Sequence, residues 1–393
     1  MASALTARLS HRVPRLSELI GAAAVEAWWE GLRAVYLWQV ERDLELLTRH
    51  VGWPGVAGAY RTPLRNPNEL FATAYELRTA AKLAPVVDGL ELRPRVSAGA
   101  CDLAVRLAGQ RVFLEVTTRD DVFPWQRGGR VEDPPLTARE TIHREFRTTT
   151  PDQLVPTRDV PASEELRQAI TREVGQLPRG EFNVVVLGTP NSKCLDVETA
   201  LFGDERFRSA PRSDLERVAV ANGLFAVADE EGGLSELSAV VWLRLRHNGH
   251  DIRTHGRSFL NPKARHPLPP GIENVFRRVF DRTSVLEEEL QRITRVLVEQ
   301  YRAERILLFG SLAREFPADG VHDASDIDLA VVKPTTARFV DRLREAVDLV
   351  EPRVGLNLLV YTPEEIAQAQ SSGRSFVRDE ILARGKLLFP ADG

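Results

Sequence analysis

Two aspartates near the C-terminal end of the chain have the spacing of a metal-binding pair. Asp326 and Asp328 lie two residues apart in SDIDLAVV, which predicts a strand. Because alternate side chains of a strand share one face, both carboxylates point the same way while Ile327 and Leu329 face the core. Such a pair suits Mg²⁺, which takes one or two carboxylates in proteins and leaves room for phosphate oxygens.

A glycine–serine step precedes this pair. Residues 306–309 predict an apolar strand that runs into Gly310 and Ser311, and residues 312–315 predict a short helix. Glycine lets the backbone approach a phosphate closely, and Ser311 with the helix N-terminus behind it offers donors to that anion. The two features together indicate chemistry on a phosphate in the presence of magnesium.

This stretch resembles the nucleotidyltransferase fold of the DNA polymerase β superfamily, above all its minimal prokaryotic branch. The likeness rests on FGS and SDIDLAV, and it continues in the predicted strand 356–361, in TPEE (362–365) and in EILARGKLLF (380–389). It implies a Mg²⁺ (or Mn²⁺) cofactor and an NTP, with ATP expected. Asp326 and Asp328 would then be catalytic metal ligands, and Gly310, Ser311 and Asn357 would lie at the nucleotide.

Asn357 departs from that family, which carries a third carboxylate on the later strand. An amide can coordinate magnesium through its oxygen, but it brings no charge and cannot act as a general base. Glu364 and Glu365 lie too far along the chain to replace it without a rearrangement. An active transferase and a nucleotide-binding remnant are both consistent with this substitution.

A second acidic set lies in the first half of the chain. Residues 68–84 predict a helix that carries Glu76, and strands are predicted at 90–96, 101–107 and 111–118. Asp102 begins the second strand, and Glu115 lies inside the third, where an ionised group among apolar residues needs a reason. Neighbouring strands would bring Asp102 and Glu115 together to hold a magnesium ion that activates water.

Helix, meander, Asp and then Glu-x-Lys is the pattern of the PD-(D/E)XK nuclease fold, which this region resembles through Glu76, Asp102 and Glu115. A helix at 163–176, a strand at 182–188, a helix near 196–201 and a closing strand at 237–245 fit the rest of that fold. Thr117 stands where the family has its catalytic lysine. Neither Arg119 nor Lys82 is a simple substitute, because guanidinium is a poor base and Lys82 lies well away from Glu76 around the helix. The alternative is a plain antiparallel meander with acidic strand ends.

The segments between these regions carry weaker signals. An insertion at 119–161 contains two aromatic residues and many arginines: Phe123, Trp125, Arg127, Arg130, Arg139, Arg144, Arg147 and Arg158. These residues suit phosphate contacts and base stacking. Acidic residues are interspersed among them, so a solvated loop is an equally good interpretation. Three histidines at 244–257 indicate basic surface rather than zinc. Residues 15–50 predict a helix and 53–67 a linker. Ser284 and Glu287 predict a capping box that opens a further helix.

Composition limits the remaining choices. The chain has 393 residues, a net charge of −4 and ordinary hydrophobic and charged contents of 43% and 27%, which fits two or three domains without a global nucleic-acid signature. Two cysteines give no disulfide framework and indicate a cytoplasmic protein. No apolar run is long enough for a membrane span, and the basic start lacks the apolar core of a secretory signal.

These features predict an α/β (α+β) protein in three parts. Residues 1–60 form a helical segment, 61–272 a restriction-endonuclease-like mixed-sheet domain, and 284–393 a nucleotidyltransferase-like α/β domain. The two resemblances imply a nuclease-like module joined to a magnesium-dependent nucleotidyltransferase-like module, as in prokaryotic defence and toxin–antitoxin proteins. Its expected partners are a nucleotide, DNA or RNA, and a protein target, with no membrane. The alternative is a catalytically degenerate regulatory or scaffold protein, which Asn357 and Thr117 favour, so enzyme activity stays open.

Overall fold

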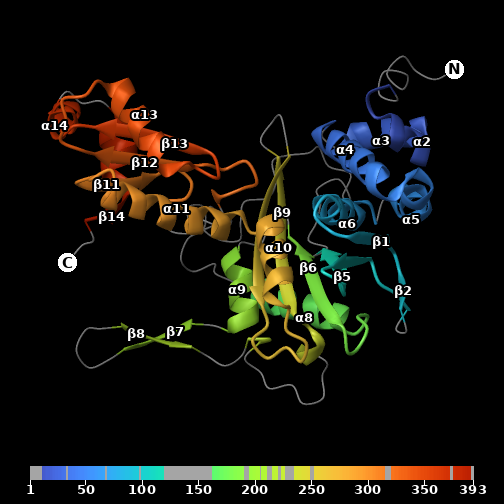
Figure 1. The fold of residues 1–393 in the computed structure, drawn as a ribbon. Helices are drawn as coiled ribbons and strands as arrows, with labels where there is room; N and C mark the ends of the chain where they lie inside the picture. Colours follow the sequence, from blue (N-terminus) through green and yellow to red (C-terminus); the bar gives the residue numbers. More distant parts are fainter. Residues whose placement is uncertain are drawn as a thin grey trace, which may run out of the picture. The chain divides into compact units, whose positions relative to one another are not determined.

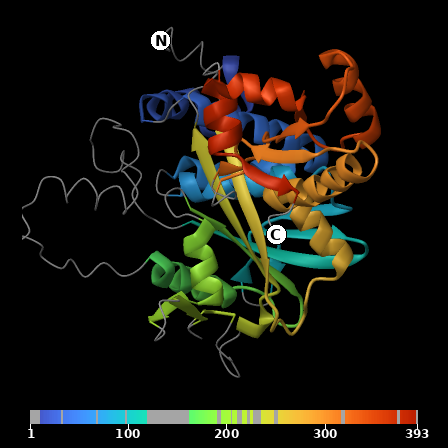
Figure 2. The same ribbon diagram turned by 90° about the vertical axis from the view of Figure 1, so that its left-hand side faces the viewer.

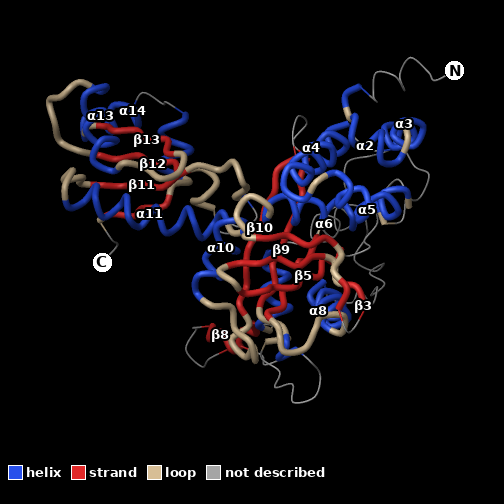
Figure 3. The backbone as a smooth tube through the Cα atoms, turned by 45° about the vertical axis from the view of Figure 1, so that its right-hand side comes forward, coloured by secondary structure: helices blue, strands red, loops and turns tan. Residues whose placement is uncertain are grey.

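The chain folds as a mixed α/β protein with a helical N-terminal region and two separate mixed sheets (Figures 1 and 3). A computed structural model describes residues 11–31, 34–66, 69–96, 99–118, 162–189, 194–203, 205–209, 215–219, 223–225, 234–247, 252–314, 320–371 and 375–390. The chain divides into two compact units, and each is described by itself. Unit 1 comprises Met1–Arg253 and Ser258–Val279, and unit 2 comprises Thr254–Arg257 and Phe280–Gly393.

Unit 1 opens with helices rather than with one long helix and a linker. The helices are α2 (Pro14–Ile20), α3 (Ala22–Gly31), α4 (Ala34–Val51), α5 (Trp53–Arg65) and α6 (Leu70–Leu83). Left-handed glycines, Gly21 at φ +93° and Gly52 at φ +83°, separate α2 from α3 and α4 from α5. The predicted linker was wrong: Pro54 lies in the first turn of α5, where its missing N–H costs nothing, and Tyr60 and Leu64 are buried.

Six strands form the sheet of unit 1, in the order β1-β4-β5-β6-β9-β10. They are β1 (Gly89–Leu92), β4 (Leu103–Leu107), β5 (Gln110–Thr118), β6 (Phe182–Gly188), β9 (Ala239–His247) and β10 (Ile252–Leu260). The pairs β1–β4 and β4–β5 are antiparallel, whereas β5–β6 and β6–β9 are parallel. The predicted hairpin is confirmed, with both turn residues, Ala108 and Gly109, at positive φ.

Two expectations for this sheet need correction. The expected first strand (90–96) is interrupted at Arg93, whose φ is +50°, so that β1 is followed by a separate ribbon of β2 (Arg95–Val96) and β3 (Gly99–Ala100). The strand β9 does not close the sheet, because the histidine-rich run continues into β10 beside it (Figure 2). His255 in β10 is buried and therefore does not belong to a basic surface.

The remaining elements of unit 1 are helices and a separate two-stranded ribbon. They are α8 (Ala162–Val174), α9 (Cys194–Phe202), a ribbon of β7 (Glu205–Ser209) and β8 (Leu215–Ala219), the short helix η3 (Leu234–Glu236) and α10 (Pro270–Phe280). The expected helices near 163–176 and 196–201 and the strand 182–188 are confirmed. The insertion at 119–161 lies outside the described residues, and so does Arg119.

Unit 2 has a four-stranded sheet in the order β13-β12-β11-β14. Its elements are α11 (Arg282–Glu299), β11 (Arg305–Phe309), β12 (Ile327–Val332), α13 (Phe339–Val350), β13 (Leu356–Tyr361), α14 (Pro363–Ser371), the π-helical segment η4 (Phe376–Ala383) and β14 (Lys386–Phe389). Strand β12 is antiparallel to β11 and parallel to β13. Asp281, not Ser284, caps α11: its carboxylate accepts the Ser284 N–H (3.0 Å), so the predicted capping box was wrong.

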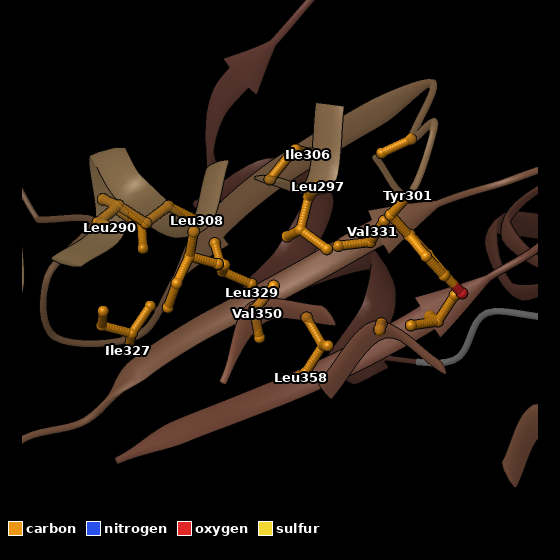
Figure 4. Packing of buried hydrophobic residues seen from close by; sticks show 14 of the residues in the cluster. Leu290, Leu297, Tyr301, Ile306, Leu308, Ile327, Leu329, Val331, Val350 and Leu358 are labelled. Atoms are coloured by element: carbon orange, nitrogen blue, oxygen red, sulfur yellow. The ribbon is translucent and has the colours of Figure 1, made fainter. Parts of the chain in front are cut away.

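The sheet of unit 2 is buried on both faces. One face packs against α11 and α13 through Ile327, Leu329 and Val331 of β12, as Figure 4 shows. The other face packs against α14 and η4 through Ala330 and Val332. Burying each such side chain stabilises the fold by about 1.5–3 kcal/mol. The alternation places Asp328 on the face of Ala330 and Val332, as the sequence predicted.

No helix among the described residues is both long enough and apolar enough to cross a membrane.

Candidate functional site

The aspartate pair of unit 2 lies at the end of the sheet where β11 finishes and where β12 and β13 begin. Asp326 is the residue before β12, and Asp328 is its second residue. In the strand register, Asp328 stands opposite Phe309 of β11 on one side and opposite Asn357 of β13 on the other. Both carboxylates are half-buried. The fold therefore brings together Asp326, Asp328 and Asn357 at the start of two neighbouring strands.

Two glycines make room for these carboxylates. A methyl group on Gly310, which has φ +73°, would overlap Oδ2 of Asp328. A methyl group on Gly355, just before β13, would overlap Oδ1 of Asp326. Each carboxylate thus rests against bare backbone, and any side chain at either glycine would displace it. Gly355 is a site residue that the sequence did not reveal, because only the β12–β13 register places it there.

Asn357 contacts the pair directly. Its Nδ2 donates to Oδ1 of Asp328 at 2.9 Å. Burial raises the pKa of Asp328, the charge of Asp326 acts in the same direction, and the Asn357 hydrogen bond opposes both. The third position of the site therefore holds a donor that stabilises the ionised Asp328 without adding negative charge.

The loop before Asp326 is held by residues that the sequence analysis missed. The Arg282 guanidinium donates through Nε (3.1 Å) and Nη2 (2.7 Å) to the Ser325 carbonyl, and the Ser325 hydroxyl accepts the His322 N–H at 3.0 Å. On the other side, the Ile327 N–H donates to the Gly355 carbonyl at 2.9 Å. Asp326 is thus fixed from both sides by contacts across 43 and 28 residues, which no local pattern encodes.

The prediction of a short helix after Ser311 was wrong for residues 312–314. Leu312 and Ala313 form a turn, and residues 315–319 lie outside the described range. Helix N–H donors behind Ser311 therefore form no part of this site as described. Two features of the predicted glycine–serine step are present: Asp328 approaches the Gly310 backbone closely, and the neighbouring Ser311 is half-buried.

In unit 1 the fold brings Asp102 and Glu115 together across the β4–β5 pair. The Asp102 N–H donates to Oε2 of Glu115 at 3.2 Å, and the Val116 N–H donates to Oδ2 of Asp102 at 2.9 Å. Both carboxylates are held in place by backbone donors. Burial raises the pKa of Glu115 to about 8, with the Asp102 charge acting in the same direction, and burial also raises the pKa of Asp102.

Glu76 is engaged by an arginine instead of joining a three-carboxylate centre. It is buried on α6 and accepts from Arg93 Nη2 at 2.8 Å and from Arg93 Nε at 3.3 Å. Burial raises the pKa of Glu76 to about 7, the Asp102 charge adds to that, and the Arg93 hydrogen bonds only partly offset it. Glu76 thus lies within electrostatic reach of Asp102 but has its own cationic partner.

Thr117 has a hydrogen-bonding role at the lysine position. Its Oγ1 donates to Oε1 of Glu173 on α8 at 3.1 Å, and Gln176 also donates to Glu173. Lys82 is no substitute for the lysine, since its charge acts on Asp43. Glu173 is a further acidic neighbour that the sequence analysis missed: its charge raises the pKa of Glu115.

Both carboxylate pairs fit a divalent ion only in part. The described residues contain no group of three or more His, Cys, Asp or Glu side chains placed to hold a metal. Two hard oxygen donors do suffice for Mg²⁺ when substrate phosphates and water supply the remaining ligands. Asp326 with Asp328, and Asp102 with Glu115, each provide that minimal set. Burial raises the pKa of Asp328, Asp102 and Glu115, and a cation would counter that rise.

Comparison with known proteins identifies no relative. No protein-family model, no curated protein and no solved structure matches the chain. The site's own geometry must therefore support any functional conclusion.

Proposed function

We propose that unit 2 binds a magnesium–nucleoside triphosphate, with ATP as the expected nucleotide, through a nucleotidyltransferase-like fold. The observation that carries this proposal is that Asp326, just before β12, and Asp328, the second residue of β12, each rest against a glycine that leaves the backbone bare. Carboxylates in this position hold the ion, and the Gly310–Ser311 step lies where a phosphate would approach the backbone. A bound ion would supply charge neutralisation for the phosphates.

For nucleotidyl transfer the described site lacks a general base. Asn357 donates a hydrogen bond to Asp328 and has no basic group for a substrate hydroxyl proton. Glu365 is occupied, because it accepts from Arg342 at 2.5 and 2.8 Å and closes a capping box with Thr362. Among the described residues, Asp326 and Asp328 are therefore the carboxylates that the fold offers to a substrate, and binding is expected to exceed turnover.

Calorimetry on the full chain tests the proposal. A double variant, Asp326→Asn with Asp328→Asn, should bind magnesium–ATP about 100-fold more weakly or not at all, since both anionic ligands are lost. Asp348→Asn is the matched control, because Asp348 is an exposed aspartate of α13 in the same unit. Equal affinities of the double variant and the parent would end the proposal.

A second candidate function belongs to unit 1, which would bind a divalent ion and act weakly on nucleic-acid phosphodiesters through a restriction-endonuclease-like fold. The observation that favours it is the convergence of the half-buried Asp102 and the buried Glu115, whose carboxylate accepts the Asp102 N–H. Thr117 supplies no ammonium group for the attacking water, so metal binding should be better preserved than cleavage. A chain with both sites weakened would act as a binding or regulatory protein.

Tryptophan fluorescence reports on unit 1 and can therefore test this second function in the full chain. All six tryptophans of the chain lie at or before residue 242, so their signal follows unit 1 alone. Manganese should raise the melting temperature of the parent, and Asp102→Ala and Glu115→Ala should abolish that rise along with any cleavage of DNA or RNA. Asp88→Ala, at an exposed aspartate just before β1, is the control. No manganese effect on the parent would contradict this function.

A further inference from the structure

Arg93 occupies an unusual position beside the carboxylates of unit 1. It follows β1 with a left-handed φ of +50°, which costs a non-glycine residue about 1–2 kcal/mol. Its N–H donates to the Asp102 carbonyl at 2.8 Å. The strained turn therefore fixes Arg93 to the residue that carries one of the candidate metal ligands.

The side chain of Arg93 points into the acidic cluster. It pairs through Nε and Nη2 with Glu76, whose side chain is only 4% exposed, and its charge also acts on Asp102. The guanidinium carbon lies 5.9 Å from the ring centroid of the fully buried Tyr60. Arg93 is thus the cation that the fold places among Glu76 and Asp102.

One edge of the Arg93 guanidinium is left for a ligand. The side chain of Arg93 is 36% exposed, and its Nη1 donates to none of the residues that the structure describes. The fully buried Tyr60 hydroxyl belongs to the same cluster: burial raises its pKa, and the charges of Glu76 and Asp102 act in the same direction. A planar guanidinium with an open N–H edge is well suited to a phosphate oxygen.

We propose that Arg93 is the phosphate-binding residue of the unit 1 site and takes over the charge, though not the base chemistry, of the missing lysine. Its ligand is the phosphodiester backbone of a nucleic acid strand, and Glu76 holds the guanidinium in place while competing for it. This proposal rests on the second function above, but it concerns binding that requires no metal ion.

The competition between Glu76 and phosphate gives variants with opposite effects. We would measure fluorescence anisotropy of a fluorescein-labelled single-stranded DNA oligonucleotide with the full chain in EDTA. Arg93→Ala should weaken binding by about tenfold, since one charge-assisted contact is lost. Arg93→Lys keeps the charge but not the fork and should lose less. Glu76→Gln should strengthen binding several-fold, because the guanidinium loses its anionic competitor.

A matched control exists in the same unit. Arg78 and Asp43 form another buried pair, with Nη1 and Oδ1 3.1 Å apart. Arg78→Ala and Asp43→Asn should cost stability, as seen by tryptophan fluorescence, and leave DNA affinity unchanged. The proposal is overturned if the Arg93 and Glu76 variants change affinity no more than these controls, or if the parent does not bind DNA in EDTA.

The two proposals for unit 1 fail separately. Manganese stabilisation that depends on Asp102 and Glu115, without Arg93-dependent DNA binding, would remove the phosphate role and keep the metal site. Arg93-dependent binding without any manganese effect would do the reverse. An RNA oligonucleotide of the same sequence serves as a second probe of the shared phosphodiester chemistry.

Discussion

The two carboxylate pairs of this protein are held in contrasting ways. In unit 2, Asp326 and Asp328 are half-buried and rest against Gly355 and Gly310, and Asp328 accepts a hydrogen bond from the Asn357 amide. In unit 1, Asp102 and Glu115 lie in a tighter environment: Glu115 is only 5% exposed, and backbone N–H groups hold both carboxylates.

The two units reduce the repulsion between neighbouring carboxylates in different ways. Unit 2 leaves both carboxylates partly exposed to water, which screens their repulsion, so its stability should depend little on a cation. In unit 1 Glu115 is buried beside the half-buried Asp102, and burial raises the pKa of both carboxyls. Arg93 also pairs with Glu76, so bound protons and a guanidinium offset the repulsion between the carboxylates. Stability of unit 1 should therefore respond to pH and to cations much more than that of unit 2.

The largest expected effect tests that difference through Glu115. Its folded pKa of about 8 lies above the ordinary value of 4.5, so the folded state binds this proton more tightly than the unfolded state. The stabilisation is fully present below about pH 4.5 and is lost as pH rises through about 8, by on the order of a few kcal/mol. Tryptophan-monitored denaturation in EDTA from pH 5 to 8 should show this loss.

Glu115→Gln sharpens the result, because an amide does not titrate. The variant should lose less stability over the same pH range, with the remaining slope due to Glu76 and Asp102, whose pKa values are also raised. Saturating manganese should reduce the slope of the parent but not that of the variant. A parent whose stability is constant over this range would show that Glu115 is ionised throughout and would erase the contrast with unit 2.

The next effect concerns the glycines of unit 2. Gly310→Ala should weaken magnesium–ATP binding about tenfold or more, because its methyl group would displace Asp328 and its φ of +73° adds about 1–2 kcal/mol of strain. Gly355→Ala should weaken binding through Asp326 without a left-handed strain. Calorimetry measures both, and Gly271→Ala, where a methyl group meets open space, is the control. Normal ATP binding by both alanine variants would place the nucleotide elsewhere.

The sequence predicted the elements on which these sites stand wherever a local pattern decides them. Strands β6 and β13 match their predicted bounds because each is an apolar run of strand length between turn-forming residues. The predicted strand after Asp326 is confirmed as β12, with Asp328 on the face opposite Ile327 and Leu329, as the period of two in a strand requires. The α5 region failed because Pro54 and Gly55 were taken as linker signals, whereas a proline in the first turn is compatible with a helix.

What the sequence could not predict depends on contacts between distant residues. The seat of Asp326 on Gly355 requires the parallel register of β12 and β13, and the Arg282 clamp spans 43 residues. Arg93, which pairs with Glu76, has a positive φ. Non-glycine residues seldom adopt this conformation, so no sequence pattern predicts it at Arg93. Such features arise from the packed fold and have no local signature, so the cationic partner of the unit 1 site could be found only in the structure.

A smaller effect is expected from Asn357→Asp, which would place a third carboxylate beside the aspartate pair of unit 2, as Glu76 lies near the pair of unit 1. The new carboxylate would face Asp328 where a donor now lies, so unit 2 should lose about 1 kcal/mol without magnesium and recover it when the ion binds. Hydrogen exchange of the β12 and β13 amides measures the stability, and labelled-nucleotide transfer should rise. Asn357→Ala is the control. If both variants behave alike in magnesium, the third position has no part in metal binding.

The smallest effect separates a structural from a catalytic role for Thr117. Thr117→Val keeps the shape of the side chain but removes its hydrogen bond to Glu173, so unit 1 should lose about 1 kcal/mol or less. The loss lies at the low end because Gln176 still donates to Glu173. Manganese stabilisation should persist, since Asp102 and Glu115 keep their backbone donors. Tryptophan fluorescence follows both quantities, with Thr171→Val on the exposed side of α8 as the control. If Thr117→Val instead abolished the manganese effect at unchanged stability, the hydroxyl would belong to the metal site, and the two carboxylate pairs would each depend on a neutral third residue.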